Sequence, residues 1–546
     1  MEGMMMHRPL LVSNILEYAT NAHRKAGITS VRTEGDIHSY TYPEAGARIA
    51  QLAHALRRRG VQIGDRVATL AWNGYRHLEL YYAIGGIGAV CHTINPRLSA
   101  EQLIYIVNHA EDRLLFLDTT FVPIIAAVRD HLPDDITYVI MTDRAHMPDT
   151  PFDALCYEDL LAPEDPVIAW PELDENTACG LCYTSGTTGH PKGALYSNRS
   201  SVLHAFTLVV SQKRSFEEGK PILPVVPLFH VNAWGLPYVA PMIGASLVMP
   251  GHALDGPSIF RLMDEQKVYS AWGVPTVWMG LLAEIKAQGR IPEGFGDVVI
   301  GGSAAPRSMI EAFETRGVKV GHAWGMTEMS PIGTHGCLPA WMEDLPFEER
   351  IRAKSKQGRR CFGVDLKIVD EDGATLPQDG QAVGELFVRG NAVVSGYFRN
   401  PEATAKAHDA DGWFGTGDVA SVDPDGFLSI QDRAKDLIKS GGEWISSIDL
   451  ENAATAHPAI AQCAAIGVPH PRWDERPVLV AVPAGEARPT AEDLHDLLSE
   501  HFAKWQMPDD IIWLDALPMT ATGKVSKLNL RKQLADYQHP DLRVSA

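Results

Sequence analysis

Cysteine is scarce in this chain, with seven residues among 546. A small disulfide-stabilised fold needs a dense set of cysteines, so the sequence excludes that class and favours a reducing compartment. Cys179 and Cys182 form a C-x-x-C pair, but no second pair is present to complete a zinc site. Residues three apart on a strand also point to opposite faces. We therefore interpret this spacing as incidental.

Basic residues are outnumbered, and long apolar runs are missing. The 48 lysines and arginines stand against 68 acidic residues, which gives a formal net charge of -20. This balance disfavours nucleic acid as a partner and leaves no basic patch for an anionic membrane. The N-terminus lacks an apolar core of signal-peptide length, and no stretch approaches the ~20 apolar residues of a membrane span. We expect a cytoplasmic protein without stable membrane insertion.

Alternating strand and helix patterns dominate the first half of the chain. Helical spacing occupies 14–26, 42–59, 76–88 and 101–111. Strand-like runs occupy 67–71, 90–96, 114–118, 138–141 and 246–249. This alternation predicts an α/β fold in which helices flank parallel sheets.

The pattern changes in the second half. Between 361 and 431, short β-rich runs are separated by Asp-Gly turns, which predicts a small antiparallel or β-barrel-like subdomain. The charged residues 338–356 before it are expected to form an irregular surface excursion. Residues 437–546 combine strand and helix patterns and predict a compact α+β unit.

The most distinctive segment is the glycine- and hydroxyl-rich run at 182–193. A predicted strand at 178–182 precedes it, and helix N-cap candidates follow at 197–200. Glycines let backbone N–H groups approach phosphate oxygens, hydroxyls add donors, and Lys192 adds positive charge. The Walker phosphate loop does not match, because Pro191 stands where its second glycine is required. Taken alone, the run suits a phosphate loop and an ordinary surface loop equally well.

Later segments repeat this glycine-containing character at 301–306, 322–328, 413–418 and 517–524. Ser303 resembles a hydrolase nucleophile, but Ala305 replaces the final glycine of that motif. A tryptophan such as Trp324 more often packs in a core than binds a base. An aspartate in a glycine-rich turn, such as Asp418, more often makes an Asx-turn, and Lys524 is by default a solvated lysine.

Together, these segments resemble the signature motifs of the AMP-forming acyl-CoA synthetases. Segments 227–234 and 439–447 are similar in particular to bacterial medium- and long-chain fatty-acid CoA ligases. The resemblance covers nearly the whole chain. It implies a large N-terminal domain at 1–431, a hinge at 432–436 and a small mobile C-terminal domain at 437–546. It also implies a carboxylic acid, ATP and coenzyme A as substrates, and Mg²⁺ as cofactor.

The resemblance assigns roles to individual residues. The implied catalytic residues are Lys524, Thr184, Glu328 and His230. The implied magnesium ligands are Thr184 and Glu328. The implied nucleotide-binding residues are Thr184, Ser185, Gly186, Thr187, Thr188, Lys192, Gly302, His322, Ala323, Trp324, Thr327, Asp418, Arg433, Lys435 and Lys439. The implied acyl-binding residues are His230, Val231, Trp234 and Gly302, with Gly235 and Trp278 as further candidates. The implied CoA-binding residues are Gly441, Gly442, Glu443 and Trp444.

These residue types suit the chemistry of acid activation. Forming an acyl-adenylate develops negative charge, which a lysine such as Lys524 can stabilise. The Asp418 carboxylate can accept both ribose hydroxyls, and Glu328 offers the oxygen ligand that Mg²⁺ prefers. Trp324 departs from the tyrosine usual at this position, keeping an aromatic face for adenine but losing the phenol. The resemblance further implies that the C-terminal domain alternates between inserting Lys524 and presenting 441–444.

Several alternatives remain open at this point. His230 and Trp234 also suit simple core packing. The acid is expected to be a medium- or long-chain fatty acid, with a short thioether acid such as methylthiopropionate, or an aryl acid, as the alternative. An adenylation domain serving a carrier protein is disfavoured because no carrier segment follows Lys524. A non-catalytic nucleotide-binding protein is disfavoured by the retained motif residues, and a homodimer is left open.

Overall fold

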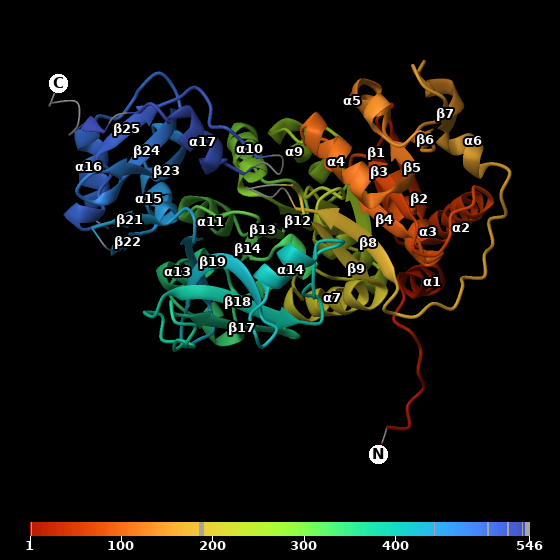
Figure 1. The fold of residues 1–546 in the computed structure, drawn as a ribbon, viewed down its shortest axis with the longest axis horizontal. Helices are drawn as coiled ribbons and strands as arrows, with labels where there is room; N and C mark the ends of the chain where they lie inside the picture. The colour runs from red at the N-terminus through yellow and green to blue at the C-terminus, as the bar shows by residue number, and fades with distance from the viewer. Residues whose placement is uncertain are drawn as a thin grey trace.

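Two seven-stranded sheets form the centre of the large lobe (Figure 1). The structure is a computed structural model that describes residues 1, 3–184, 190–441, 443–499, 502–520, 524–537, 539 and 540. In spatial order, the first sheet contains β14 (Lys319–His322), β13 (Asp297–Ile300), β12 (Ser270–Gly273), β10 (Pro221–Pro224), β11 (Ser246–Met249), β1 (Gly27–Val31) and β2 (Ile37–Thr41). The second contains β7 (Ala154–Cys156), β6 (Thr137–Ile140), β5 (Asp112–Leu117), β3 (Arg66–Leu70), β4 (Val90–Thr93), β8 (Ala178–Tyr183) and β9 (Gly193–Ser197).

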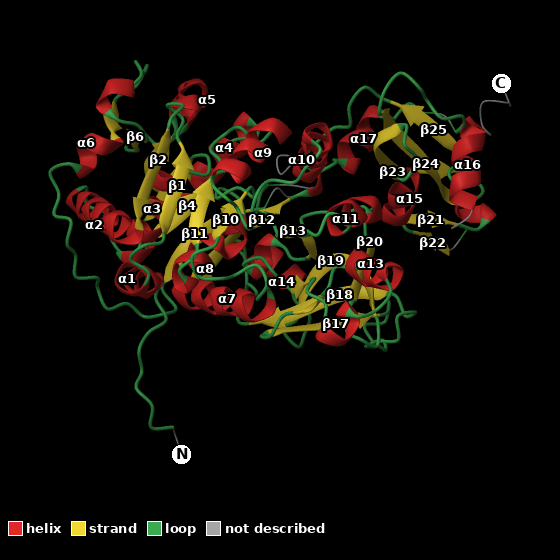
Figure 2. Ribbon diagram, turned by 180° about the vertical axis from the view of Figure 1, so that it is seen from behind, coloured by secondary structure: helices red, strands yellow, loops and turns green. Residues whose placement is uncertain are grey.

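Neighbouring strands run parallel in both sheets, except in the terminal pairs β1–β2 and β8–β9. Helices flank these sheets (Figure 2), which confirms the predicted α/β class. The helices of this lobe are α1 (Val12–Ala22), α2 (Tyr42–Arg58), α3 (Tyr75–Gly86), α4 (Ala100–Ala110), α5 (Val122–Val128), α6 (Tyr157–Leu161), α7 (Asn198–Ser211), α8 (Leu236–Ile243), α9 (Gly256–Glu265), α10 (Pro275–Gln288), α11 (Arg307–Glu314), α12 (Ala340–Glu343), α13 (Phe347–Ser355) and α14 (Pro401–Ala407).

Helix starts follow from local side-chain chemistry. The Ser197 hydroxyl accepts a hydrogen bond from the Ser200 backbone N–H and fixes the first turn of α7, as the sequence predicted. Thr41 and Glu44 form a reciprocal capping box at the start of α2. Such caps satisfy backbone donors that a helix leaves unpaired in its first turn.

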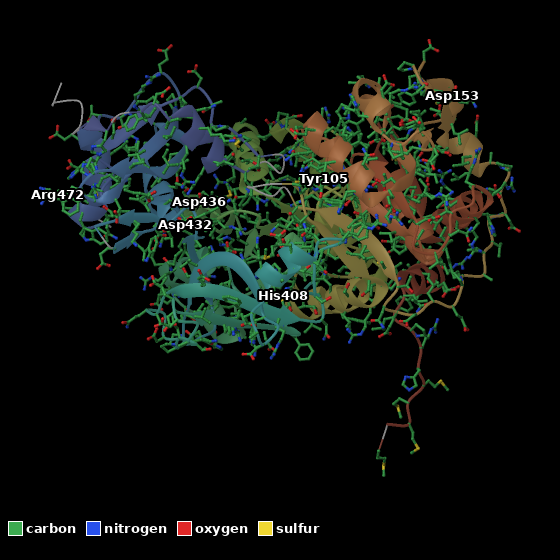
Figure 3. The ribbon with its side chains drawn as sticks, viewed as in Figure 1. Tyr105, Asp153, His408, Asp432, Asp436 and Arg472 are labelled. Carbon is green, nitrogen blue, oxygen red and sulfur yellow. The ribbon has the colours of Figure 1, made fainter. Side chains whose placement is uncertain are left out.

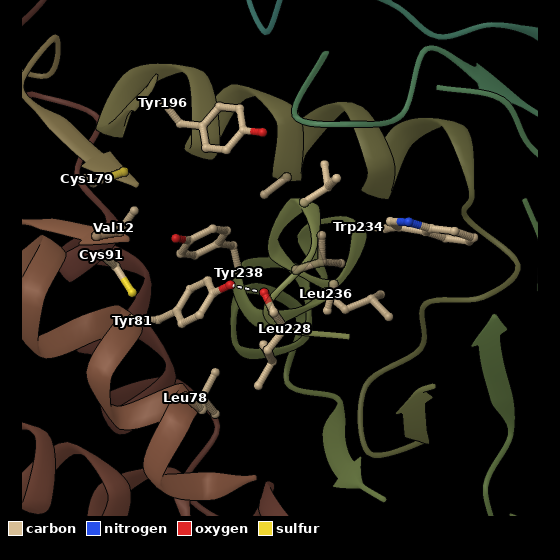
Figure 4. Packing of buried hydrophobic residues seen from close by; sticks show 14 of the residues in the cluster. Val12, Leu78, Tyr81, Cys91, Cys179, Tyr196, Leu228, Trp234, Leu236 and Tyr238 are labelled. Atoms are coloured by element: carbon tan, nitrogen blue, oxygen red, sulfur yellow. Dashed lines mark hydrogen bonds between the residues drawn. The ribbon is translucent and has the colours of Figure 1, made fainter. Parts of the chain in front are cut away.

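One hydrophobic core joins the two sheets and reaches the cavity described below (Figure 4). Tyr81 of α3 and Tyr238 of α8 lie at its centre, and the Tyr81 hydroxyl donates to the Leu228 carbonyl oxygen at 2.5 Å. Trp234 belongs to the same cluster. Rigid packing of this kind fixes the segment from Leu228 to Trp234 relative to both sheets.

A four-stranded antiparallel sheet follows the large sheets. Its order is β17 (Val364–Val369), β18 (Gly384–Gly390), β19 (Phe414–Val422) and β20 (Leu428–Arg433). Antiparallel pairing is therefore the arrangement adopted here, of the two that the turn pattern allowed. A two-stranded ribbon of β15 (Thr334–His335) and β16 (Arg359–Arg360) lies between these parts.

The C-terminal unit has its own sheet and its own core. Its strands are β21 (Ile438–Ser440), β22 (Glu443–Ile445), β23 (Ile460–His470), β24 (Asp474–Pro483) and β25 (Asp510–Trp513). Its helices are α15 (Ser447–Ala454), α16 (Ala491–Ser499) and α17 (Lys527–Gln533).

The expected irregular excursion at 338–356 is wrong, because α12 and α13 form there. α13 buries Ile351 and the whole Lys354 side chain, whose Nζ pairs with Glu314 of α11 at 2.5 Å. A long lysine stem can pack among apolar groups when its charge finds a partner. The charged composition of this segment therefore favoured an irregular surface segment, although it forms a helix with one buried face.

All seven cysteines are buried and free. In the C-x-x-C pair, the Cys179 sulfur lies 3.5 Å from the Ser201 hydroxyl, and the Cys182 sulfur lies 3.1 Å from the Thr93 hydroxyl. Burial raises the pKa of the Cys179 thiol to about 12, which keeps it protonated. No helix within the described ranges combines the length and apolar character needed to cross a bilayer.

Candidate active site

A cavity of about 1180 Å³ lies between the large lobe, the four-stranded sheet and the C-terminal unit. The loops that follow β13 and β14 form part of its wall. This position follows from the fold, because ligands of parallel α/β sheets bind beyond the carboxyl ends of the strands. Figure 3 labels Tyr105 on one side of this region and Asp432 and Asp436 on the other.

Most of the predicted site residues meet in this cavity, although they come from distant parts of the chain. The lining includes Thr184, Lys192, His230, Val231, Trp234, Gly302, Ala323, Trp324, Thr327, Glu328, Arg433, Lys435 and Lys524. Some predictions lie outside the described residues, namely Ser185, Gly186, Thr187, Thr188 and Gly442.

Trp324 and Arg433 line the cavity, and both contact Asp418, which lies just behind them, 2% exposed and outside the described lining. The indole Nε1–H of Trp324 donates to Asp418 Oδ2 at 2.9 Å. Arg433 Nε lies 2.8 Å from the other oxygen, Oδ1. Burial raises the pKa of Asp418, while the arginine charge and the indole hydrogen bond oppose that rise. The ring predicted to stack on adenine thus contacts the carboxylate predicted to bind ribose.

Glu328 is buried beside a residue to which the sequence assigned no role. The Tyr397 hydroxyl donates to Glu328 Oε1 at 2.8 Å, and Lys192 Nζ lies 4.8 Å from the centre of the same phenol ring. Burial raises the pKa of Glu328. Tyr397 therefore touches both a predicted magnesium ligand and a predicted phosphate-binding lysine. In the sequence it begins the run Tyr397-Phe398-Arg399.

Lys524 extends from the C-terminal unit into the cavity. A Cβ added at Gly302 would lie 3.7 Å from Lys524 Cε, so the lysine approaches the loop after β13 closely. Burial and the nearby Arg433 charge lower the pKa of Lys524 to about 8, and the Asp418 and Glu328 carboxylates oppose this shift. The amine is therefore a cation at neutral pH, positioned among both carboxylates.

The segment after β10 makes an unusual left-handed turn. Val231, Asn232, Ala233 and Trp234 have φ between 44° and 55°, and Gly235 has φ of 84°. Each L-residue in this conformation costs about 1–2 kcal/mol, so the surrounding core must hold the turn in place.

This turn sets the position of Trp234 and the environment of His230. A Cβ added at Gly301 would lie 3.0 Å from the Trp234 ring, so only glycine lets the indole lie so close to the loop after β13. Burial and the Lys524 charge lower the pKa of His230 to about 3, which makes its imidazole neutral. His230 can then donate or accept one hydrogen bond at the cavity surface without adding charge.

Other predicted residues lie elsewhere. His322 is buried behind the loop after β13, where its Nε2 accepts a hydrogen bond from the Ala305 N–H at 3.3 Å. Trp278 is fully buried in the core of the first sheet. The β21–β22 hairpin carries Lys439, Gly441, Glu443 and Trp444, none of which lines the cavity as the described residues define it. Lys439 Nζ lies 5.5 Å from the Trp444 ring centre at this exposed hairpin.

Stacked rings near the phosphate-loop segment were also missed. His190 stacks on Tyr105 with ring centres 4.2 Å apart, and both line the cavity. Tyr105 in turn stacks on His109, which lies 2.7 Å from the Tyr183 hydroxyl. This contact could not be predicted, because the residues of α4 carry no motif.

The donor set fits a magnesium ion held together with substrate phosphates. Among the described residues, no group of three histidine, cysteine, aspartate or glutamate side chains could hold a metal alone. Mg²⁺ usually binds one or two protein oxygens and completes its shell with water and phosphate. Glu328, with the Thr184 hydroxyl, supplies that kind of set, and the cation would favour the charged form of the buried carboxylate.

Comparison with known families decides the classification. A model of the AMP-binding enzyme family matches residues 18–398, and a model of its C-terminal domain matches residues 449–524. The chain belongs to the AMP-binding enzyme family. This AMP-binding enzyme is an AMP-forming acid–CoA ligase that uses ATP, Mg²⁺ and CoA.

Individual relatives cover almost all of this AMP-binding enzyme. A 3-methylmercaptopropionyl-CoA ligase from Ruegeria lacuscaerulensis is 49% identical over 542 residues, which covers 98% of this chain and 99% of that protein. A medium-chain-fatty-acid–CoA ligase from Ectopseudomonas oleovorans is 46% identical and covers 98% of each chain. The crystal structure of the anthranilate CoA ligase AuaEII with anthranoyl-AMP has a TM-score of 0.86 at 25% identity, covering 97% of this chain and 99% of that one.

Proposed function

We propose that the enzyme activates a short aliphatic or thioether acid of the 3-methylmercaptopropionate type. The acid first becomes an acyl-adenylate with loss of pyrophosphate, and the CoA thiol then displaces AMP. The observation that carries this choice is the position of Trp234, whose ring lies against Gly301 beside His230. A bulky ring in this place would shorten the space open to an acyl chain. The 49% identity to the Ruegeria ligase supports the same class.

In the first step, the side chains of the cavity would divide the electrostatic work. Lys524 would neutralise charge on the carboxylate and the α-phosphate, and Lys192 and Thr184 would hold the phosphates. Neutral His230 would orient the acid without competing for its charge. Trp324 would stack on adenine, and Asp418 would accept the ribose hydroxyls. Bound Mg²⁺ would offset the charge of the phosphates.

In the second step, we infer a rotation about the predicted hinge at 432–436. The present orientation places Lys524 in the cavity and leaves the β21–β22 hairpin outside it. That is the arrangement expected for adenylation. Rotation would withdraw Lys524 and bring Gly441, Glu443 and Trp444 to the adenylate, where they would border the pantetheine chain of CoA.

A second candidate substrate is a medium-chain fatty acid, which the 46% identity to the Ectopseudomonas ligase favours. A longer chain would require Trp234 to leave its place over Gly301. A panel from propionate and 3-methylmercaptopropionate through octanoate to palmitate separates the two. We expect the highest kcat/KM for AMP release with the short thioether acid. A maximum at octanoate or palmitate would overturn this substrate class, and no AMP release with any acid would overturn the reaction.

We also infer a cytoplasmic location from the buried free thiols and the acidic net charge. Fractionation of native cells tests this location. Assembly into a homodimer remains a prediction that light scattering on the purified enzyme tests.

A further inference from the structure

Trp324 is held in a single orientation by its surroundings. Its backbone N–H donates to the Thr334 hydroxyl at 3.1 Å, and its carbonyl oxygen accepts from Gly333 N–H at 2.9 Å. A Cβ added at Gly333 would lie 2.9 Å from the indole ring, so only glycine lets the ring lie flat on this segment. Trp324 also lines the cavity, and it is 9% exposed.

Asp418 is fixed by two donors, one on each carboxylate oxygen. Trp324 Nε1 donates to Oδ2 at 2.9 Å, and Arg433 Nε lies 2.8 Å from Oδ1. The residue is 2% exposed, so water contributes little to its orientation. A carboxylate offers about four acceptor positions, so these two donors still leave room for a pair of hydroxyls.

Tryptophan joins two properties in one side chain. Its flat face can stack on a base, and its ring edge carries an N–H donor that phenylalanine lacks. In this structure the two parts of the side chain make different contacts. The ring N–H donates to Asp418, and the ring itself lines the nucleotide cavity.

We propose that Trp324 is a positioning residue that aims the Asp418 carboxylate at the ribose hydroxyls, and thereby sets how strictly the enzyme prefers ATP to deoxy-ATP. This inference rests on the nucleotide site proposed above. Loss of the indole donor leaves Asp418 free to turn about its side-chain bonds, with Arg433 as the one side-chain partner that the described residues still provide. The hydroxyl contacts then weaken, whereas stacking on an aromatic ring survives.

The test compares ATP, 2′-deoxy-ATP and 3′-deoxy-ATP in the wild type and in Trp324→Phe. Hydrogen bonds to charged groups are strong enough that we expect a wild-type preference for ATP of about tenfold or more in kcat/KM. In Trp324→Phe, kcat/KM with ATP should fall by about tenfold while the deoxy analogues change little. The preference ratio, rather than the activity, is the readout.

Four further variants sharpen the test. Asp418→Asn should abolish the preference by itself, and adding Trp324→Phe to it should change the ratio no further. Trp324→His retains a ring N–H and should restore part of the preference. Trp72→Phe is the matched control, because it also removes an indole N–H bond, to the Thr120 hydroxyl at 3.0 Å, but lies outside the cavity lining. It should leave the ratio unchanged.

The possible failures differ from one another. If Trp324→Phe lowers kcat/KM for all three nucleotides by the same factor, then Trp324 only packs or stacks, and the positioning role is refuted. A wild-type enzyme that uses the three nucleotides equally would instead remove Asp418 as the ribose acceptor and refute the proposed nucleotide site. If Trp324→Phe does not fold, Trp324→Leu, which also lacks the ring donor, takes its place, and a wild-type preference ratio in that variant refutes the positioning role.

Discussion

At the scale of single residues, the surroundings of Lys524 disfavour its protonated, charged form. Its pKa falls to about 8 from an ordinary value of 10.5, mainly because of burial. We expect kcat/KM for adenylation to decline above about pH 8, since kcat/KM reports groups of the free enzyme. Stopped assays of pyrophosphate release from pH 6 to about 10 test this expectation. A flat profile across that range would contradict the assigned role of the lysine.

The same shift predicts an opposite trend in stability. Above about pH 8 the unfolded chain holds this proton more tightly than the folded chain, because its lysine keeps the ordinary pKa. Protons bound preferentially by the unfolded state make stability rise with pH, so this contribution grows up to about pH 10.5. Urea unfolding of the wild type and Lys524→Met should therefore diverge with pH in this window. Parallel curves would show that the lysine is not buried in solution.

Tyr397 offers a second test at this scale. Tyr397→Phe removes the donor to the buried Glu328 carboxylate but keeps the ring beneath Lys192. Loss of one hydrogen bond to a charged group is worth about 1.5–3 kcal/mol, so KM for Mg-ATP should rise by about tenfold or more. Tyr82→Phe is a fair control, because it removes a buried phenol bond to the Pro237 carbonyl oxygen at 2.7 Å, away from the cavity. Equal effects of the two variants would argue for general destabilisation.

At the scale of elements, the left-handed turn at Val231–Gly235 depends on its last residue. Gly235 has φ of 84°, and a Cβ there would lie 2.8 Å from His204 Nδ1. His204 in turn accepts a hydrogen bond from the Ile332 N–H at 3.0 Å. Gly235→Ala should therefore lower the free energy of unfolding by about 2–4 kcal/mol, through conformational strain and steric overlap together.

Gly289→Ala is the matched control for this prediction. Gly289 has φ of 67° at the end of α10, but no atom lies within 4 Å of an added Cβ. Its cost should be limited to the conformational term, about 1–2 kcal/mol. Chemical denaturation of both variants measures the difference. If the two substitutions cost the same, the turn tolerates a side chain and is not held as tightly as the contacts indicate.

Elements with strong periodic patterns were predictable from the sequence, and so was the meeting of the motif residues. Strands such as β8 and the start of α7 at Ser197 follow from local apolar and capping signals. The left-handed turn does not follow from local signals, because valine and tryptophan disfavour positive φ. The packed core enforces this conformation. The bond between Trp324 and Asp418 joins residues 94 positions apart, which no local pattern can reveal. α13 was not predicted, because its buried Lys354 is indistinguishable from a surface lysine in the sequence.

At the scale of the whole molecule, contacts across the predicted hinge favour the observed orientation. Asp432 accepts hydrogen bonds from the backbone N–H of Ser447 at 2.8 Å and from the Ser447 hydroxyl. Ser447→Ala removes the second bond, together with the hydrogen bond that this hydroxyl accepts from Lys527 Nζ, and should weaken this orientation. We expect adenylation to slow several-fold, while thiolysis of preformed acyl-adenylate is maintained or faster.

Separate assays of the two half-reactions measure this shift in balance. Ser499→Ala is the control, because within the described part of the chain its hydroxyl bonds only the local Asp496 carbonyl oxygen, on the exposed side of α16. That variant should leave both half-reactions unchanged. A Ser447→Ala enzyme whose two half-reactions slow equally would show that the contact stabilises the fold without favouring one orientation.

The burial of all seven thiols has a practical consequence for observing this rotation. A maleimide dye reacts with accessible thiolates, so the native chain offers it almost no target. One cysteine introduced at the exposed Glu492 of α16 and another on the large lobe could then be labelled selectively, without first removing the native ones. Energy transfer between two such dyes would follow the movement of the small domain during turnover, molecule by molecule.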